Sequence, residues 1–211
     1  QQLFGSVPHE YRAHAAAIAG DSARLLAGFE ELDRLARLET GALVPEAGEC
    51  DLAMVTRATA AQLQSVLAAR MAGFALESND DALAVGLSAA DTELLVWRLL
   101  ATLAGATGGG EQLGLTFAAV EHEARLACEL PATLAGEQDL FAASARPTGG
   151  ALSAGAFGAG FSLRLARAEA VAAGGGLVRI GDSIVLTLPL LTAPLRLRSA
   201  SDAKARERET G

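Results

Sequence analysis

The chain has few cysteines and few aromatic residues. Of its 211 residues, two are cysteines, Cys50 and Cys128, and 4% are aromatic. Two cysteines cannot make the disulfide framework of a small secreted domain, and neither has a Cys or His neighbour at metal-ligand spacing. We therefore expect two ordinary reduced thiols. With so few aromatic side chains, the core must be built mainly from Leu, Val and Ala.

Long apolar runs and an excess of positive charge are also missing. No apolar run reaches the ~18–20 residues that cross a bilayer, and no basic region with an apolar stretch behind it marks a signal peptide. The net charge of −8 offers no attraction for nucleic acid or an anionic membrane. We expect a cytoplasmic module without membrane contact of its own. The abrupt start, "QQLFGSVP", indicates a segment of a longer protein. That longer protein can itself be membrane-associated.

The first strong pattern is helical and runs from His9 to about Leu38. Apolar or small residues recur at seven-residue spacing in two parallel rows: Ile18, Leu25 and Leu32, then Ser22, Phe29 and Ala36. Such rows are typical of a bundle or coiled-coil seam. A lone helix of this kind would leave its stripe in water, so we predict a helical partner from upstream or from a second subunit.

Breaking residues divide the middle of the chain. Residues 39–49 contain two glycines and a proline and are expected to form a linker. Asp51 is placed to cap a helix that runs to about Ala72. Two short strand candidates follow, "FALES" and "ALAVGLS". Ser88 or Asp91 is then placed to cap an apolar-rich helix.

The last third mixes paired strands with one more helix. The stretch "EQLGLTFAAVEHEARLACEL" predicts two antiparallel strands that turn near residues 121–123. Residues 142–160 are rich in Gly, Ala and Ser and are expected to form a long loop. A helix ending at residues 174–176 and a hairpin turning at Gly181 complete the pattern. Segregated strands and helices of this kind predict an α+β fold.

We divide the chain into three parts on this basis. Residues 1–44 hold the bundle helix, and residues 45–192 form the mixed α+β domain. Residues 193–211 carry a mixed-charge tail that we expect to be disordered.

The order of these pieces resembles the C-terminal part of a bacterial sensor histidine kinase. The resemblance covers roughly residues 3–190. "LDRLARLETG" is similar to the end of the second helix of the dimerisation and phosphotransfer hairpin, and "ECDLAMVTRA" to the start of the ATP-binding domain. "AADTELLVWRLLATLAGA" resembles the asparagine-box helix, "FGAGFSLRLARAEAVAAGGGL" the second glycine box with its helix, and "IVLTLP" the last strand. The resemblance implies a long bundle helix followed by a Bergerat-type ATPase-like α/β sandwich, a mixed sheet with helices on one face.

The chain departs from this family at the nucleotide site. The resemblance implies an asparagine pair that holds magnesium against the phosphates, but Ala101 and Gly105 stand there, and the only asparagine of the chain is Asn79. Without the amide, the metal lacks an oxygen ligand. In the first glycine box Glu129 stands for the aspartate that accepts from adenine. Pro131 and Thr133 replace glycines that let the backbone approach the nucleotide.

The second glycine box survives in part, as Gly158, Gly160 and Ser162. Glycines before a helix can cradle phosphates at its positive end, and they suit a plain loop-to-helix junction equally well. The candidate nucleotide-binding residues are therefore Glu129, Gly158, Gly160 and Ser162. We predict no catalytic residue, no metal ligand and no cofactor. The alternative is an active kinase that binds Mg-ATP through these atypical contacts.

The resemblance implies a role in two-component signalling. We expect a pseudokinase module that dimerises through a helical bundle and docks, or supports phosphotransfer to, the receiver domain of a response regulator. A homodimer and a receiver domain are thus the expected partners. A third hypothesis, a dimerisation module without any phosphorelay role, stays open.

Three histidines and the single tryptophan invite functional hypotheses. His9 and His14, in "PHEYRAH", are five residues apart and do not share a helix face as a metal-binding i, i+4 pair would. The family's phospho-accepting histidine lies in the preceding helix, so "PHEYRAH" resembles the lead-in to the second helix. His122 is expected at a solvated turn, and Trp97 in the core of its helix layer.

Overall fold

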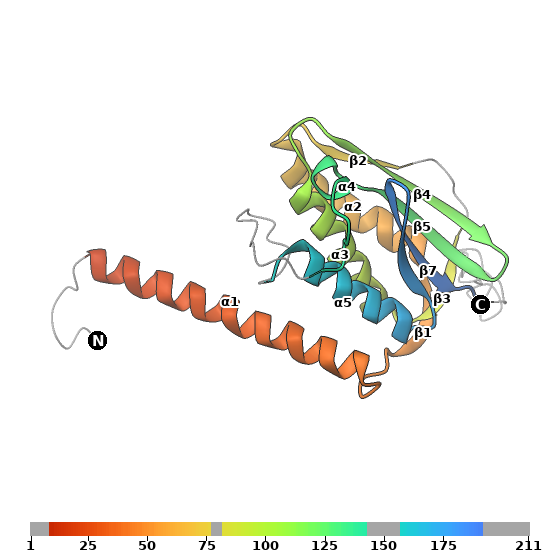
Figure 1. Cartoon of the computed structure of the whole chain (residues 1–211), viewed down its shortest axis with the longest axis horizontal. Helices are drawn as coiled ribbons and strands as arrows, with labels where there is room; N and C mark the ends of the chain where they lie inside the picture. Colours follow the sequence, from red (N-terminus) through yellow and green to blue (C-terminus); the bar gives the residue numbers. More distant parts are fainter. Residues whose placement is uncertain (1–8, 77–81, 143–156, 192–211) are drawn as a thin grey trace, which may run out of the picture.

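The seven-residue rows form one continuous helix. The computed structural model describes residues 9–76, 82–142 and 157–191, and its first element is helix α1 (His9–Glu39). The apolar rows face solvent over most of their length: Ile18 is 66% exposed and Leu25 is 64% exposed. Figure 1 shows the N-terminal half of α1 projecting away from the rest of the molecule. The stripe is left without a partner within the described chain.

A five-stranded mixed sheet forms the centre of the remaining chain. Its order is β2 (Gly73–Leu76), β4 (Gln112–Val120), β5 (Glu123–Glu129), β7 (Ser183–Pro189) and β6 (Gly176–Ile180). The β2–β4 pair is parallel and the other three pairs are antiparallel. Strand residues alternate between faces, and most buried residues of β4, β5 and β7 lie on one face; Val185 of β7 is buried on the other. Both predicted hairpins are confirmed.

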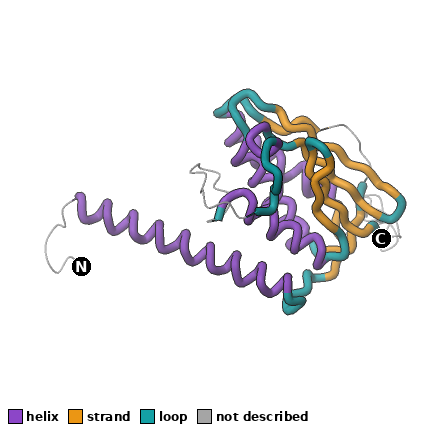
Figure 2. The backbone as a smooth tube through the Cα atoms, in the orientation of Figure 1, coloured by secondary structure: helices purple, strands orange, loops and turns teal. Residues whose placement is uncertain are grey.

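Three helices cover that face of the sheet, as Figure 2 shows. They are α2 (Leu52–Ala68), α3 (Ala89–Ala106) and α5 (Gly158–Ala172). The main core lies between helices and sheet and consists mostly of leucine, with Phe74 and Phe117 as its only Phe, Tyr or Trp members in the described residues. This agrees with the expectation of a core poor in aromatic side chains, and the α+β architecture is as predicted.

The two predicted helix caps are present. The Asp51 carboxylate accepts hydrogen bonds from the backbone amides of Ala53 and Met54 at the start of α2. It also accepts from the amide of Leu83, which precedes strand β3 (Ala84–Leu87). The Ser88 hydroxyl accepts from the Asp91 amide at the start of α3. Asp51 therefore joins two elements as well as capping one.

Two predicted segments differ in the structure. The expected linker at residues 39–49 contributes its last residues to strand β1 (Ala47–Asp51), which pairs with β3 in a second, two-stranded sheet. Its partner is more than thirty residues away, so local composition did not reveal it. Helix α2 ends at Ala68 instead of Ala72 because Met71 adopts a φ of 56°. The predicted tail and most of the predicted loop at 142–160 lie outside the described residues.

The C-terminal end of α1 is attached to α5. Leu35 and Leu38 of α1 pack with Phe161 and Leu165 of α5 in a small apolar cluster separate from the main core. The long helix thus contacts the sheet and its covering helices only near its end, and α5 lies between that end and the sheet (Figure 1).

Both cysteines are buried and free. Burial raises the pKa of the Cys128 thiol on β5. The pKa of the Cys50 thiol on β1 is also raised, and burial is the largest cause. Because the thiolate is the reactive form, both should resist thiol reagents in the folded protein. Introduced surface cysteines can therefore be labelled selectively.

Asp51→Ala should destabilise the domain by about 1–3 kcal/mol, because it removes the cap of α2 and the tie to Leu83 together. Asp51→Asn keeps an acceptor oxygen and should retain most of the stability. Urea denaturation followed by circular dichroism measures both. Equal losses in the two variants would show that the carboxylate charge, and not the acceptor oxygen, is what matters.

Candidate functional site

The helix that would hold the metal-binding amides is α3. Ala101 and Gly105 are both partly buried on it, and neither side chain has an oxygen. The nearest hydroxyl, that of Thr102, donates a 2.6 Å hydrogen bond to the Arg98 carbonyl on the same helix. No group of three or more metal-binding side chains occurs in the described part of the chain. At the two positions that the resemblance assigns to the asparagine pair, α3 therefore offers no side-chain oxygen to a magnesium-bound triphosphate. Asn79 lies outside the described residues.

Glu129, the candidate adenine-binding residue, ends strand β5. Its predecessor Cys128 is buried beneath the helices, so the alternation of the strand sends the Glu129 side chain to the opposite face of the sheet. Its carboxylate lies over Gly114 on β4 and accepts a 2.7 Å hydrogen bond from the Gly114 amide. Glu129 is exposed and already has a partner in the sheet.

The segment after Glu129 is tied down by side-chain hydrogen bonds. Pro131 precedes the short helix α4 (Ala132–Ala135). The Glu111 carboxylate accepts from the Ala132 amide at 2.7 Å, and the Thr133 hydroxyl donates to the carbonyl of Ala106, the last residue of α3, at 2.6 Å. Arg179 of β6 donates to the carbonyls of Ala135 and Glu137. The residues that replace glycines thus lie in a segment fixed against α3 and β6.

The second glycine box forms the start of α5. Gly158 opens the helix with a φ of 83°, a conformation that favours glycine. Gly160 and Ser162 are buried in its first turns. The backbone carbonyl of Ala142 packs directly against Gly160, where a Cβ atom would overlap with it. This contact gives the glycine a packing role in the structure and supports the plain loop-to-helix interpretation.

The four candidate residues do not converge on one point. Gly158, Gly160 and Ser162 lie on α5, which covers one face of the sheet. The Glu129 carboxylate lies on the opposite face. Their assignment as a nucleotide site stays a prediction.

A charged cluster joins α1, α3 and α5, and the sequence patterns did not reveal it. Glu169 of α5 accepts from Nε of Arg34 on α1 at 2.6 Å and from Nε of Arg98 on α3 at 3.2 Å. Arg98 also pairs with Glu31 of α1 at 3.0 Å, and Arg34 lies 3.6 Å from Asp91 of α3. The signal in the sequence that could have revealed this cluster is Glu169, a charged residue on a face of α5 that is otherwise mostly Leu and Ala.

The single tryptophan is not a core residue. Trp97 is 43% exposed and lines a groove of about 570 Å³ between α2 and α3, together with Met54 and Leu94. The prediction that it belongs to the core was wrong, because its side chain lies at the open groove between α2 and α3.

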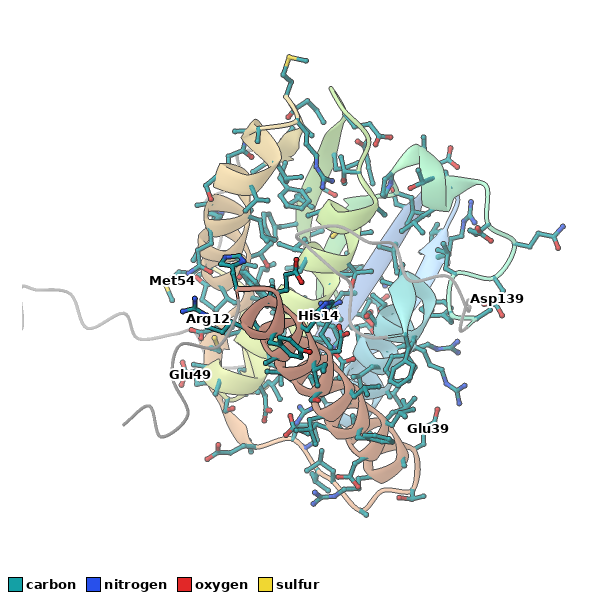
Figure 3. The ribbon with its side chains drawn as sticks, turned by 90° about the vertical axis from the view of Figure 1, so that its left-hand side faces the viewer. Arg12, His14, Glu39, Glu49, Met54 and Asp139 are labelled. Atoms are coloured by element: carbon teal, nitrogen blue, oxygen red, sulfur yellow. The ribbon has the colours of Figure 1, made fainter. Side chains whose placement is uncertain are left out.

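The histidines lie at exposed positions. His9 and His14 are in the first turns of α1, and Figure 3 shows His14 and Arg12 on opposite sides of that helix. His122 is exposed at the turn between β4 and β5, as expected. Within residues 9–76, 82–142 and 157–191, no helix is both long and apolar enough to span a bilayer.

Comparisons with solved structures identify the fold. Full-length ShkA, solved with AMPPNP, is similar at a TM-score of 0.68 and 16% identity over 91% of this chain and 42% of its own. The histidine kinase AdeS of Acinetobacter baumannii has a TM-score of 0.59 at 17% identity, over 91% of this chain and 88% of its own. Histidine kinase ThkA, in a complex with the response regulator TrrA, has a TM-score of 0.55 at 16% identity, over 92% and 55%.

The chain therefore has the fold of the C-terminal part of a sensor histidine kinase, a long hairpin helix followed by an ATPase-like sandwich. It spans less than half of the ShkA chain. No protein-family profile matches it, and no curated sequence matches it either. Identities this low establish the fold and leave the chemistry to the residues.

Gly160→Ala should lower the stability by about 1–3 kcal/mol, because the new methyl group meets the Ala142 carbonyl. Gly20→Ala is the matched control: its Cβ would meet nothing within 4 Å on α1, and it should stabilise the helix by up to about 1 kcal/mol. Thermal melts of both variants test this. A Gly160→Ala protein as stable as the wild type would remove the packing explanation and return that glycine to the nucleotide hypothesis.

Proposed function

We propose that this chain is the C-terminal module of a pseudokinase in two-component signalling. It acts on the cytoplasmic side as a dimerisation scaffold that docks a response-regulator receiver domain or supports phosphotransfer. The observation that carries the proposal is the combination of a histidine-kinase fold with a helix α3 that has no asparagine. The fold supplies the scaffold, and α3 lacks the amide that magnesium requires.

The exposed stripe of α1 supports dimerisation. Ile18, Leu25 and Phe29 are each more than 60% exposed along one side of the helix. Contiguous apolar surface of this kind marks an interaction site on a soluble domain, and heptad spacing suits a helical bundle. The proposed occupant is the hairpin's first helix, with a second copy completing four helices.

Docking of a receiver domain is proposed from the similarity to ThkA, whose structure contains the response regulator TrrA. The residues that would contact a receiver are those of the α1 bundle. A kinase with atypical nucleotide contacts is the competing function, and the second glycine box is the feature that favours it: Gly158 opens α5 with a left-handed φ at a helix N-terminus.

Mg-ATP should leave the melting temperature of the chain unchanged within about 1 °C at millimolar concentration. A ligand at 100 times its Kd adds about 2.7 kcal/mol, which is a shift of several degrees for a domain of this size. Differential scanning fluorimetry with and without magnesium measures it. A magnesium-dependent rise that disappears in Gly158→Ala would show nucleotide binding at the start of α5 and would contradict the pseudokinase proposal.

Leu25→Glu should dissociate the α1 dimer, with affinity reduced at least about tenfold, because it places a charge in the proposed apolar seam. Light scattering after size-exclusion chromatography reports the mass. Val171→Glu is the control, since Val171 is an exposed apolar residue on α5 away from that seam. If Leu25→Glu stays dimeric, α1 is not the dimerisation surface.

A further inference from the structure

Five charged side chains connect α1 to the five-stranded sheet and its helices α2, α3 and α5, which we call the ATPase-like layers. These five side chains come from three different helices. Glu31 and Arg34 belong to α1, Asp91 and Arg98 to α3, and Glu169 to α5. We call these five residues the interhelix charge cluster. Every ion pair of the cluster except that between Arg98 and Glu169 crosses from α1 to the layers. The cluster is therefore an attachment between the long helix and the rest of the fold.

Glu169 is the centre of this cluster. Its side chain is 5% exposed, and both of its oxygens are bonded, Oε1 to Arg34 and Oε2 to Arg98. A carboxylate this deeply buried keeps its charge only when cations and donors replace its water. One of the two guanidinium groups that do so belongs to α1. Moving α1 away would leave the Glu169 charge with Arg98 alone.

The cluster is not fully satisfied in the attached arrangement. It holds three carboxylates and two guanidinium groups, and Glu31 Oε2 is buried without a hydrogen-bond partner among the described residues. A buried acceptor without a donor is costly, and it regains water when it is exposed. Attachment of α1 therefore gains the bonds to Glu169 and shields one oxygen of Glu31, whose side chain is 21% exposed, from water. These opposing terms bring the attached and detached arrangements closer in free energy.

Little apolar surface reinforces the attachment. Leu35 and Leu38 are the residues of α1 buried against Phe161 and Leu165, and the stripe from Ile18 to Phe29 is exposed. A buried ion pair adds little net stability over apolar packing, and in some proteins it selects one geometry. The charge cluster thus sets the orientation in which the end of α1 packs against α5.

We propose that the interhelix charge cluster is a lock that holds the ATPase-like layers against α1 in one orientation, and that neutralising Glu169 opens it while both parts stay folded. The lock is a property of this chain's own residues and operates whether or not a receiver domain binds. Its function is to couple the position of α1, which the bundle partner sets, to the orientation of the layers behind it.

The test measures the distance between α1 and the sheet by spin labels. Cysteines are introduced at Arg24 of α1, an exposed position off the apolar stripe, and at Val178 of β6, which is also exposed. The two native cysteines are buried. Dilution with unlabelled chains removes distances between subunits. The distribution is compared for the wild type, Glu169→Gln and Arg164→Ala. Arg164→Ala is the matched control, because it removes the exposed 2.7 Å pair with Glu39 between the same two helices.

Glu169→Gln should add a second, broad distance population and speed amide exchange in residues 31–39 about tenfold or more. Arg164→Ala should leave both unchanged. Exchange protection of β5 and β7 reports whether the layers remain folded. If Glu169→Gln unfolds them, Arg34→Gln decides, since Arg34 lies on α1 outside the main core. If Glu169→Gln, or Arg34→Gln where the first variant unfolds, shows only the distance seen in the wild type, the lock is overturned. It is also overturned if Arg164→Ala adds the second distance population to the same extent.

Discussion

The burial of one carboxylate, Glu169, is the constraint on which the arrangement of the molecule depends. The sheet and its three helices form a sandwich whose core consists mostly of leucine. Helix α1 packs against this sandwich only through its last turns. At that contact the Glu169 charge has lost its water, so Arg34 of α1 and Arg98 of α3 must stand beside it. The long helix is placed by this requirement as much as by apolar packing.

Packing contacts also account for the residues at the two positions that resemble glycine boxes. Thr133 and Pro131 stand where the histidine-kinase resemblance implies glycines, and Thr133 bonds to the last carbonyl of α3. Gly160 remains a glycine while the Ala142 backbone packs against it. A glycine of a binding motif can thus have a packing role of its own, independent of any ligand. Retained glycines alone are weak support for a retained ligand.

Exposure of the α1 stripe gives the proposed pseudokinase its physical basis. A helix whose heptad rows face water is incomplete by itself, whereas the ATPase-like layers have their own core. The module therefore combines a self-sufficient domain with a helix that depends on a partner. A signal that changes the bundle can reach the layers through the end of α1, where the charged contacts lie.

The sequence by itself determined the local elements. Heptad rows defined α1, alternation defined the β4–β5 hairpin, and Asp51 and Ser88 marked helix starts, because each of these signals involves residues only a few positions apart. The order of motifs was enough to predict the fold class. Tertiary structure alone decided that residues 47–51 pair with β3, that Glu129 and Gly160 lie on opposite sides of the sheet, and that Trp97 is exposed. It also brought Arg34 to Glu169 across 135 residues. No local period encodes such a meeting, since it depends on how complete elements pack against one another.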